Sequence, residues 1–468
     1  MLTHTLTSRL IDICGPENVI TALDALDTYS RDQTEDLSYL PEVVCKPDST
    51  EQIQAIARLS DELECPITVR GAGSGLAGGA LPIASGIVLS MERMNRILYI
   101  DRDNYQVRVE PGVITEELQN ALAEQDLFYP VDPASRGWSY IGGNVATGAG
   151  GPRAVKYGTV RDYVLNIKAV LPNGDLIETG ANTLKNSTGY DLTRLLVGSE
   201  GTLAIITEIT LKLLPLPTHR LLLLMPFESA EQACACVAAI FQAGVTPSAL
   251  EFMERAAIDR AANYVGGTSL SLPDEIQAHL LVEVDGRDPE QLYRECEAIA
   301  EVGERYGCTD ALFADSAEQQ RELWHLRRNV GNATKVGTIY KEEDTVVPRA
   351  HLPELLRKVK KVGAAFGFES VCYGHAGDGN LHVNILRGDL TDTQWHDELP
   401  EAIREIFTFV RSLGGTISGE HGIGYVQRRY MDIAFGEAEL CLMQGIKAAF
   451  DPKGLLNPGK IWLTPEYP

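Results

Sequence analysis

Two short glycine-rich segments near the C-terminus carry residue types that could do chemistry. The first contains His375 and His382, and the second contains Glu420 followed directly by His421. Two imidazoles and a carboxylate suit Zn²⁺ or a similar transition metal with one position open for a substrate. Glycine permits close backbone approach, which is typical of tightly shaped sites. The pattern predicts a divalent-metal site with one spare base, while a metal-free structural role for either histidine fits the spacing equally well.

The composition is that of a globular protein with an acidic surface. The 468 residues exceed a single ordinary core and predict two large domains or three smaller ones. Lys and Arg number 41 against 65 Asp and Glu, a net charge of -24. Such a surface argues against nucleic acid and anionic membranes as partners.

The location of the protein is predicted from three patterns. The longest apolar run, 221–227, is too short to cross a membrane and contains Pro226. The N-terminus lacks a charged-then-apolar signal pattern, so we expect a cytoplasmic protein. The nine cysteines are scattered without iron–sulfur spacing, and we expect reduced, mostly buried thiols.

The elements that must position these residues fall into three segments. Residues 43–217 alternate strand and helix patterns, and prolines at 215 and 217 end the block. Residues 219–413 alternate strand-like runs with charged helices, which predicts an α+β domain. We therefore expect domains at 1–217, 218–413 and 414–468. The predicted helices are 50–63 (capped by Ser49 or Thr50), 289–306, 317–335, 351–366 and 438–450, and the predicted strands are 65–70, 87–90, 97–100, 106–109, 166–171, 204–214, 220–225, 279–284 and 381–385, with a hairpin at 172–175.

Two glycine clusters lie in the N-terminal half. The first, 70–76, follows a predicted strand, and its backbone N–H groups could converge on a pyrophosphate. It does not fit the Rossmann fingerprint, because Pro82 cuts short the helix that should follow. The second cluster, 141–158, is too long and too rich in glycine for a simple turn.

Together with the segment 191–203, these clusters make the chain similar to a known family. From about Pro41 to Lys460 the sequence resembles the FAD-linked oxidoreductases of the vanillyl-alcohol oxidase type. More narrowly, it resembles the bacterial branch that contains D-lactate dehydrogenases, glycolate oxidase flavin subunits and D-2-hydroxyglutarate dehydrogenases. The resemblance implies an α+β protein, with a two-subdomain FAD-binding fold and an α+β substrate (cap) domain.

The resemblance also implies which residues bind the cofactor. The first glycine cluster would wrap the FAD pyrophosphate, and the second would line the flavin. The family's covalent flavin histidine has no counterpart in 70–76 or 133–158, so we expect non-covalent FAD. The implied contacts are Arg70, Gly71, Ala72, Gly73, Ser74, Gly75, Leu76, Pro133, Ser135, Gly142, Gly143, Asn144, Thr147, Gly151, Tyr157, Gly158, Glu200, Gly201 and Ile206.

By the same resemblance, His375, His382 and Glu420 would bind a divalent metal, with Zn the first expectation. His421 would be the catalytic base, since an imidazole accepts a proton near neutral pH; the alternative is a histidine that steadies the metal site. Asn384 lies two residues after His382, so on a strand both side chains point to the same face. Asn384 would then bind the substrate or orient a ligand.

The substrate carboxylate requires a cation. Arg327 matches the family's substrate-contacting arginine and could form a bidentate clamp. Arg328 should face another way and be solvated, and we expect His325, His351 and His396 to be surface or packing residues. Lys341 could contact the substrate or form a surface salt bridge. The chain departs from the hydroxyglutarate-specific pattern at Gly331, which favours a short monocarboxylate such as D-lactate.

The sequence thus predicts an FAD- and metal-dependent D-2-hydroxy acid dehydrogenase, with D-2-hydroxyglutarate and glycolate as alternative substrates. A metal-dependent hydrolase and a non-catalytic electron-transfer subunit are alternatives from other classes. Electrons would pass to a separate acceptor: an electron-transfer flavoprotein, an iron–sulfur subunit, a quinone or a cytochrome. A homodimer is the default expectation for an enzyme of this kind.

Overall fold

The chain forms two compact units in the computed structural model, which describes residues 2–464 except 269, 271 and 315. The first unit is built from Met1–Gly150, Thr159–Leu216 and Glu420–Pro468. The second comprises Pro217–Gly419 together with the short segment Gly151–Gly158. No helix in the described part of the chain is long and apolar enough to cross a membrane.

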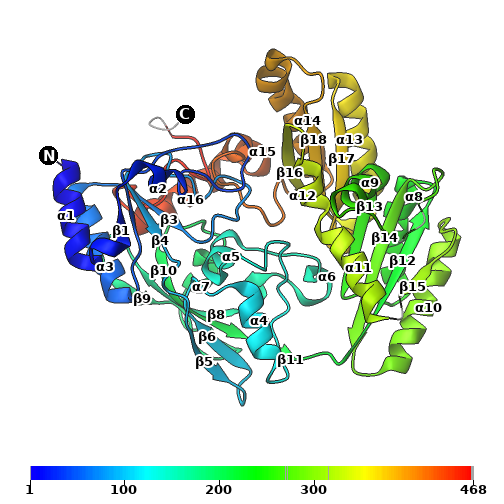
Figure 1. Ribbon diagram of the computed structural model, residues 1–468, viewed down its shortest axis with the longest axis horizontal. Coiled ribbons are helices and arrows are strands. Elements are labelled where there is room, and N and C mark those ends of the chain that lie inside the picture. Colours follow the sequence, from blue (N-terminus) through cyan, green and yellow to red (C-terminus); the bar gives the residue numbers. More distant parts are fainter. Residues whose placement is uncertain (1, 269, 271, 315, 465–468) are drawn as a thin grey trace. The chain divides into compact units, whose positions relative to one another are not determined.

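The first unit contains two larger sheets and a two-stranded ribbon (Figure 1). One sheet has the order β1-β2-β4-β3, in which β2, β4 and β3 run parallel. The other has the order β5-β6-β10-β8-β9 and is antiparallel throughout. The strands are β1 (Val19–Ile20), β2 (Val43–Cys45), β3 (Ile67–Arg70), β4 (Ile87–Ser90), β5 (Ile97–Asp101), β6 (Gln106–Val109), β7 (Leu127–Phe128), β8 (Val164–Val170), β9 (Leu176–Glu178), β10 (Ile205–Lys212) and β11 (Leu214–Pro215).

α1 and α3 of the first unit bury their apolar faces in a shared core. Ile53, Ile56 and Leu59 of α3 pack in one core with Leu6 and Leu10 of α1, as the i, i+3 spacing requires. The side chain of Ser49 accepts a hydrogen bond from Gln52 N and so caps α3. The helices are α1 (Leu2–Cys14), α2 (Leu23–Asp27), α3 (Thr50–Leu63), α4 (Thr115–Ala123), α5 (Ile141–Thr147), α7 (Leu192–Leu196), α15 (Met431–Ala434) and α16 (Glu437–Phe450).

The second unit is organised by one antiparallel seven-stranded sheet of order β15-β12-β14-β13-β17-β18-β16. Its long strands β12 and β14 are buried over most of their length because both faces of the sheet are covered. The strands are β12 (His219–Phe227), β13 (Ala249–Glu254), β14 (Ala278–Gly286), β15 (Leu312–Ala314), β16 (Tyr340–Val346), β17 (Glu369–Gly374) and β18 (Asn380–Leu386).

Two sets of helices accompany this sheet (Figure 1). Residues of α9, α11 and α12 share a core with the side chains of Leu281, Met253 and Tyr373 on one face of the sheet. α8, α10, α13 and α14 pack with one another and contact β12, β14 and β17. The helices are α6 (Ala154–Tyr157), α8 (Ala230–Gln242), α9 (Arg255–Tyr264), α10 (Pro289–Arg305), α11 (Ala317–Arg328), α12 (Val330–Lys335), α13 (Leu352–Phe366) and α14 (Leu399–Ser412).

The structure differs from the expected boundaries in four places. Segment 151–158 groups with the second unit, and the later boundary falls after Gly419 instead of after residue 413. The expected helix 317–335 is two helices, because the side chain of Asn329 donates to His325 O and competes with the helical backbone. The expected strand 204–214 is divided between β10 and β11, which pair with different strands.

Candidate functional site

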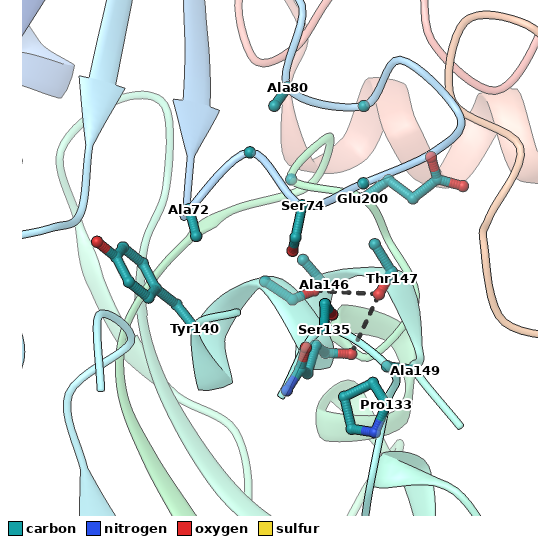
Figure 2. Close-up of a pocket in the computed structure, with 18 of the residues that line it drawn as sticks. Ala72, Ser74, Ala80, Pro133, Ser135, Tyr140, Ala146, Thr147, Ala149 and Glu200 are labelled. Carbon is teal, nitrogen blue, oxygen red and sulfur yellow. Dashed lines mark hydrogen bonds between the residues drawn. The ribbon is translucent and has the colours of Figure 1, made fainter. Parts of the chain in front are cut away.

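A cavity in the first unit collects the two glycine clusters. The loop after β3 forms one wall, and α5 with the preceding segment 133–140 forms another. The clusters lie against each other: a Cβ added to Gly71 would be 3.8 Å from the Cα of Gly143. In Figure 2, Ala72, Ser74 and Ala80 lie on one side of the cavity, and Pro133, Ser135 and Thr147 lie opposite. The hydroxyl of Thr147 is within hydrogen-bond distance of Gly143 O at 3.2 Å.

Most of the residues expected to bind FAD line this cavity. The exceptions are Arg70, which is buried at the end of β3, and Gly151, Tyr157 and Gly158, which belong to the second unit. Tyr140 and Gly79 also line the cavity and were not predicted, although Tyr140 directly precedes the second glycine cluster and Gly79 lies three residues after the first. The predicted residues at the cavity are Gly71, Ala72, Gly73, Ser74, Gly75, Leu76, Pro133, Ser135, Gly142, Gly143, Asn144, Thr147, Glu200, Gly201 and Ile206.

The glycines leave space for a cofactor. A Cβ on Gly75, Gly79 or Gly143 would meet no atom within 4 Å, and all three residues line the cavity. These positions therefore form a cradle that side chains would fill, which fits a dinucleotide lying close to the backbone. Gly142 has a different role, since its Cβ would collide with Pro111 at 2.4 Å. It allows α5 to pack closely.

Two residues near the C-terminus hydrogen-bond to the backbone of residues 78–81, in the loop that follows β3. The ammonium group of Lys460 donates to Gly78 O at 2.7 Å and Leu81 O at 2.6 Å. Asn457 Nδ2 donates to Gly79 O at 3.0 Å and to Glu200 O at 2.8 Å. Burial lowers the pKa of Lys460 to about 7, against the opposing effects of Asp32 and Glu200. The loop is thus fixed by residues almost 400 positions away in sequence.

Backbone N–H groups of the protein itself bind the Glu200 carboxylate. It accepts hydrogen bonds from Ile423 N at 2.8 Å and Gly424 N at 2.7 Å. Burial raises the pKa of Glu200, and these two bonds with the charge of Lys460 partly offset that effect. Glu200 therefore connects one wall of the cavity to the segment that immediately follows His421.

Glu420 and His421 line the same cavity as the glycine cradle. Gly150 lies close beside them, since a Cβ added there would be 3.1 Å from Glu420 Oε2. The residue expected to be the base and one expected metal ligand therefore lie at the predicted FAD site.

The other two expected metal ligands lie on one face of the sheet in the second unit. Tyr373 pairs with His382 and Asp344 pairs with His382 in the strand register, so their side chains share that face. His375 and His382 are buried, and their ring centroids are 5.3 Å apart. Two buried imidazoles at this separation are suitable nitrogen donors for Zn²⁺.

Asn384 shares the face of His382, as its spacing predicts. Asn384 is fully buried. Among the described residues its side-chain amide makes no hydrogen bond of good geometry, although it is close enough to the Tyr373 hydroxyl to influence the pKa of that group. An amide in this state is suited to binding a polar ligand.

A buried carboxylate that the sequence analysis did not single out lies among these residues. Both Glu251 oxygens are 2.9 Å from His375 Nδ1, and Oε2 is 2.5 Å from Arg327 Nη2. Burial alone would raise the pKa of Glu251, but Arg327, His375 and His382 outweigh it and the pKa is lowered. The sequence did contain a signal, since Glu251 is a lone charge between Leu250 and Phe252.

Asp344 is a second carboxylate missed by the sequence analysis. Its Oδ1 lies 3.6 Å from His382 Nδ1 and accepts a hydrogen bond from Asn380 at 2.7 Å. Its Oδ2 accepts from Ser418 Oγ at 3.0 Å and Gly419 N at 2.8 Å. Asp344 therefore fixes the peptide that immediately precedes Glu420 in the chain.

The structure separates the three basic candidates. Arg327 is buried on α11, with its guanidinium over the Tyr373 ring, whereas Arg328 is partly exposed over Trp324. Lys341 pairs with Ile385 in the register, so it lies on the sheet face opposite Asn384, and its ammonium is over the Trp395 ring. The structure thus does not bring Lys341 together with His382 and Asn384. His325 and His396 are exposed and His351 is partly exposed.

The segment Gly151–Gly158 is bound to β14 by charged contacts. Lys156 Nζ donates to the backbone oxygen and to Oδ1 of Asp285, both at 2.7 Å, and the Tyr157 hydroxyl donates to the same carboxylate at 2.8 Å. Arg153 lies 3.6 Å from Glu283. These contacts explain why this part of the second glycine cluster groups with the second unit.

Comparisons with known proteins agree with this arrangement. Residues 41–180 match the model of the FAD binding domain, and residues 216–461 match that of the FAD linked oxidases, C-terminal domain. D-lactate dehydrogenase of Anaerostipes hadrus is 39% identical over 90% of this chain and 89% of its own length. Glycolate oxidase subunit GlcD of Bacillus subtilis is 37% identical over 99% and 97%, and D-2-hydroxyglutarate dehydrogenase of Stutzerimonas stutzeri is 33% identical over 99% and 100%.

Solved structures confirm the fold. p-Cresol methylhydroxylase superposes with a TM-score of 0.79 over 99% of this chain and 97% of its own, at 18% identity. 4-Ethylphenol oxidase from Gulosibacter chungangensis superposes with a TM-score of 0.77 over 99% and 98%, also at 18% identity. The expected α+β fold of the vanillyl-alcohol oxidase type is thus confirmed. The chain belongs to the FAD-linked oxidases, with an N-terminal FAD-binding domain and the family's C-terminal domain.

Proposed function

We propose that the protein is an FAD- and divalent-metal-dependent dehydrogenase that oxidises a D-2-hydroxy acid, with D-lactate the first choice, to the 2-oxo acid. The observation that carries the proposal is the place of His421 and Glu420 on the cavity that contains the glycine cradle. A base beside a flavin site is the arrangement that removal of a hydroxyl proton with hydride transfer requires.

Each residue then has a role in the reaction. When bound, FAD would accept the hydride at N5 and a metal held by His375, His382 and Glu420 would polarise the hydroxyl. His421 takes the hydroxyl proton. Arg327 binds the substrate carboxylate, and the Asn384 amide binds a substrate oxygen. FAD is held without a covalent bond.

Glu342 supports a substrate with a single carboxylate. It pairs with Asn384 in the register and so lies on the same face as the proposed site. Its carboxylate accepts from the Tyr373 hydroxyl at 3.1 Å and is 3.4 Å from Lys335 Nζ. Because Lys335 is already paired with Glu342, it is less available to a second carboxylate on the substrate. Gly331 adds no compensating group, since even a Cβ would be 3.1 Å from the Tyr373 hydroxyl.

The proposed reaction also requires an electron acceptor and implies a location for the protein. The electrons leave through a separate acceptor, namely an electron-transfer flavoprotein, an iron–sulfur subunit, a quinone or a cytochrome. A cytoplasmic location is supported by nine cysteines that all remain free thiols.

The first test is anaerobic mixing of the purified flavoprotein with D-lactate, L-lactate, glycolate or D-2-hydroxyglutarate, each with and without a chelator. We expect D-lactate to bleach the flavin absorbance and the chelator to prevent it. Bleaching that persists with the chelator would remove the metal from the mechanism. Failure of every acid to bleach bound flavin would contradict the proposed substrate class.

A further inference from the structure

Glu251 occupies a position fixed by the sheet. β13 pairs with β17 so that Phe252 faces Gly374 and Met253 faces Tyr373. Continuing this antiparallel register places Glu251 opposite His375. On the other side β14 contributes Leu281, so the carboxylate is enclosed and its side chain is 0% exposed. A charge in such a position persists only if partners compensate it.

The two partners of Glu251 serve different parts of the proposed reaction. Its carboxylate forms an ion pair with Arg327 and therefore acts as an acceptor. His375 Nδ1 lies 2.9 Å from both carboxylate oxygens and donates to them, which leaves the lone pair on Nε2 for a metal. The other partner, Arg327, is held by Glu251 on one edge of its guanidinium and by the Tyr373 ring on its face.

The remaining edge of Arg327 is available to a ligand. Its Nε and Nη2 are buried and make no hydrogen bond of good geometry among the residues that the structure describes, although Nη2 is ion-paired with Glu251. A guanidinium fixed at Nη2 with an unused Nε–H is oriented for a carboxylate, whereas an unrestrained arginine would lose rotamer entropy on binding.

We propose that Glu251 is a positioning residue that couples the two halves of the site, holding His375 in the tautomer that binds metal through Nε2 and holding Arg327 in the orientation that binds the substrate carboxylate. This inference rests on the proposed function and adds a residue that touches neither the substrate nor the metal. Glu251 acts only through the two side chains that it contacts.

The test is Glu251→Gln in the FAD-containing protein. The amide has nearly the same shape, but it cannot accept from both partners as a carboxylate does, so metal binding and substrate binding should weaken together. We expect Zn²⁺ affinity, measured without substrate by competition with a chromophoric chelator, to fall by about 10- to 100-fold. The KM for D-lactate should rise by roughly tenfold or more, while the bound FAD per chain stays unchanged.

Two further variants separate coupling from general damage. In an Arg327→Lys background, Glu251→Gln should add little to KM but should still weaken Zn²⁺ binding, because the two effects pass through different partners. Glu254→Gln is the matched control on the same strand. Its carboxylate contacts Lys360 and Cys372 N instead, so Zn²⁺ affinity and KM should match the wild type. Equal losses in Glu254→Gln would overturn the proposal.

A measurement on the unmutated protein guards against a variant that does not fold. Nitrogen-15 NMR of histidine-labelled, metal-free protein should show His375 protonated at Nδ1, and protonation at Nε2 instead would overturn the inference. If the wild type binds Zn²⁺ and oxidises D-lactate while Glu251→Gln does both equally well, only this inference fails. If the wild type does neither, the proposed function fails, and the tautomer still tests the contact with Glu251.

Discussion

Glycine 143 shows at the scale of one residue how the cavity is reserved for a ligand. It lies in α5 without a positive φ, and a Cβ added there would have no atom within 4 Å. Helix propensity therefore disfavours glycine here by about 1 kcal/mol relative to alanine. Gly143 therefore lowers helix stability without relieving any collision. Its role is to leave space in the cavity for a ligand.

Replacing Gly143 with leucine should abolish FAD binding without weakening the fold. The new side chain fills the cradle, and the better helix former should leave the cofactor-free protein as stable as before or more so. The ratio of flavin to protein absorbance and the urea midpoint of the cofactor-free protein measure both effects. Gly445→Leu, on the exposed part of α16, is the control and should keep its FAD. Full FAD content in Gly143→Leu would show that the cradle lies elsewhere.

The proposed carboxylate clamp gives a second prediction for a single residue. Arg327→Lys preserves the charge but loses the planar fork and the contact that fixes it to Glu251. The KM for D-lactate should rise by roughly tenfold, and kcat should change less. Arg328→Lys, on the adjacent residue that lies over Trp324, should change neither value. If the two variants behave alike, Arg327 is not the clamp.

At the scale of elements, the sequence predicted the helices and caps that depend on interactions between neighbouring residues. Helix 50–63 follows from apolar spacing and is present, and of the two expected caps, Ser49 and Thr50, the structure uses Ser49. The break between α11 and α12 depends on the side-chain bond of Asn329, which periodicity does not reveal. Glu251 and Asp344 were missed because their partners are distant in the sequence, and folding alone brings them together: Arg327 lies on α11 and His382 on β18.

A buried histidine on β14 makes the second unit sensitive to acid. Burial, aided by Arg255 and opposed by Asp259, lowers the pKa of His279 from 6.5 to about 4. Below pH 6.5 His279 is protonated in the unfolded chain but stays neutral in the folded chain. The folded state therefore loses stability as the pH falls toward 4. Between pH 7 and pH 5 this histidine should cost about 2 kcal/mol of unfolding free energy.

The measurement for His279 is urea unfolding at pH 7 and at pH 5. The loss between these pH values should be smaller by about 2 kcal/mol in His279→Leu than in the wild type. His279 Nδ1 has no hydrogen-bond partner among the described residues, so an apolar side chain should be tolerated at pH 7. Equal losses in the two proteins would mean that His279 accepts a proton in the folded state as readily as in the unfolded state.

At the scale of the whole molecule, the net charge of -24 opposes the approach of an anionic substrate. Arg327 offers little long-range attraction, because it is buried and paired with Glu251. Recognition of a 2-hydroxy acid should therefore depend on short-range contacts, while the field of the protein slows association.

Raising the ionic strength should consequently increase kcat/KM for D-lactate. Between about 10 mM and 150 mM salt the Debye length falls from about 30 Å to about 8 Å, which screens the repulsion before the substrate reaches the site. We expect kcat/KM to rise by roughly twofold or more. The kcat should not change, because it is the rate at saturating substrate and does not depend on association. Steady-state kinetics in NaCl, repeated in potassium sulfate at equal ionic strength, separate screening from competition by chloride for Arg327. A fall in kcat/KM in both salts would show that a local positive potential at the site attracts the substrate and outweighs the charge of the whole chain.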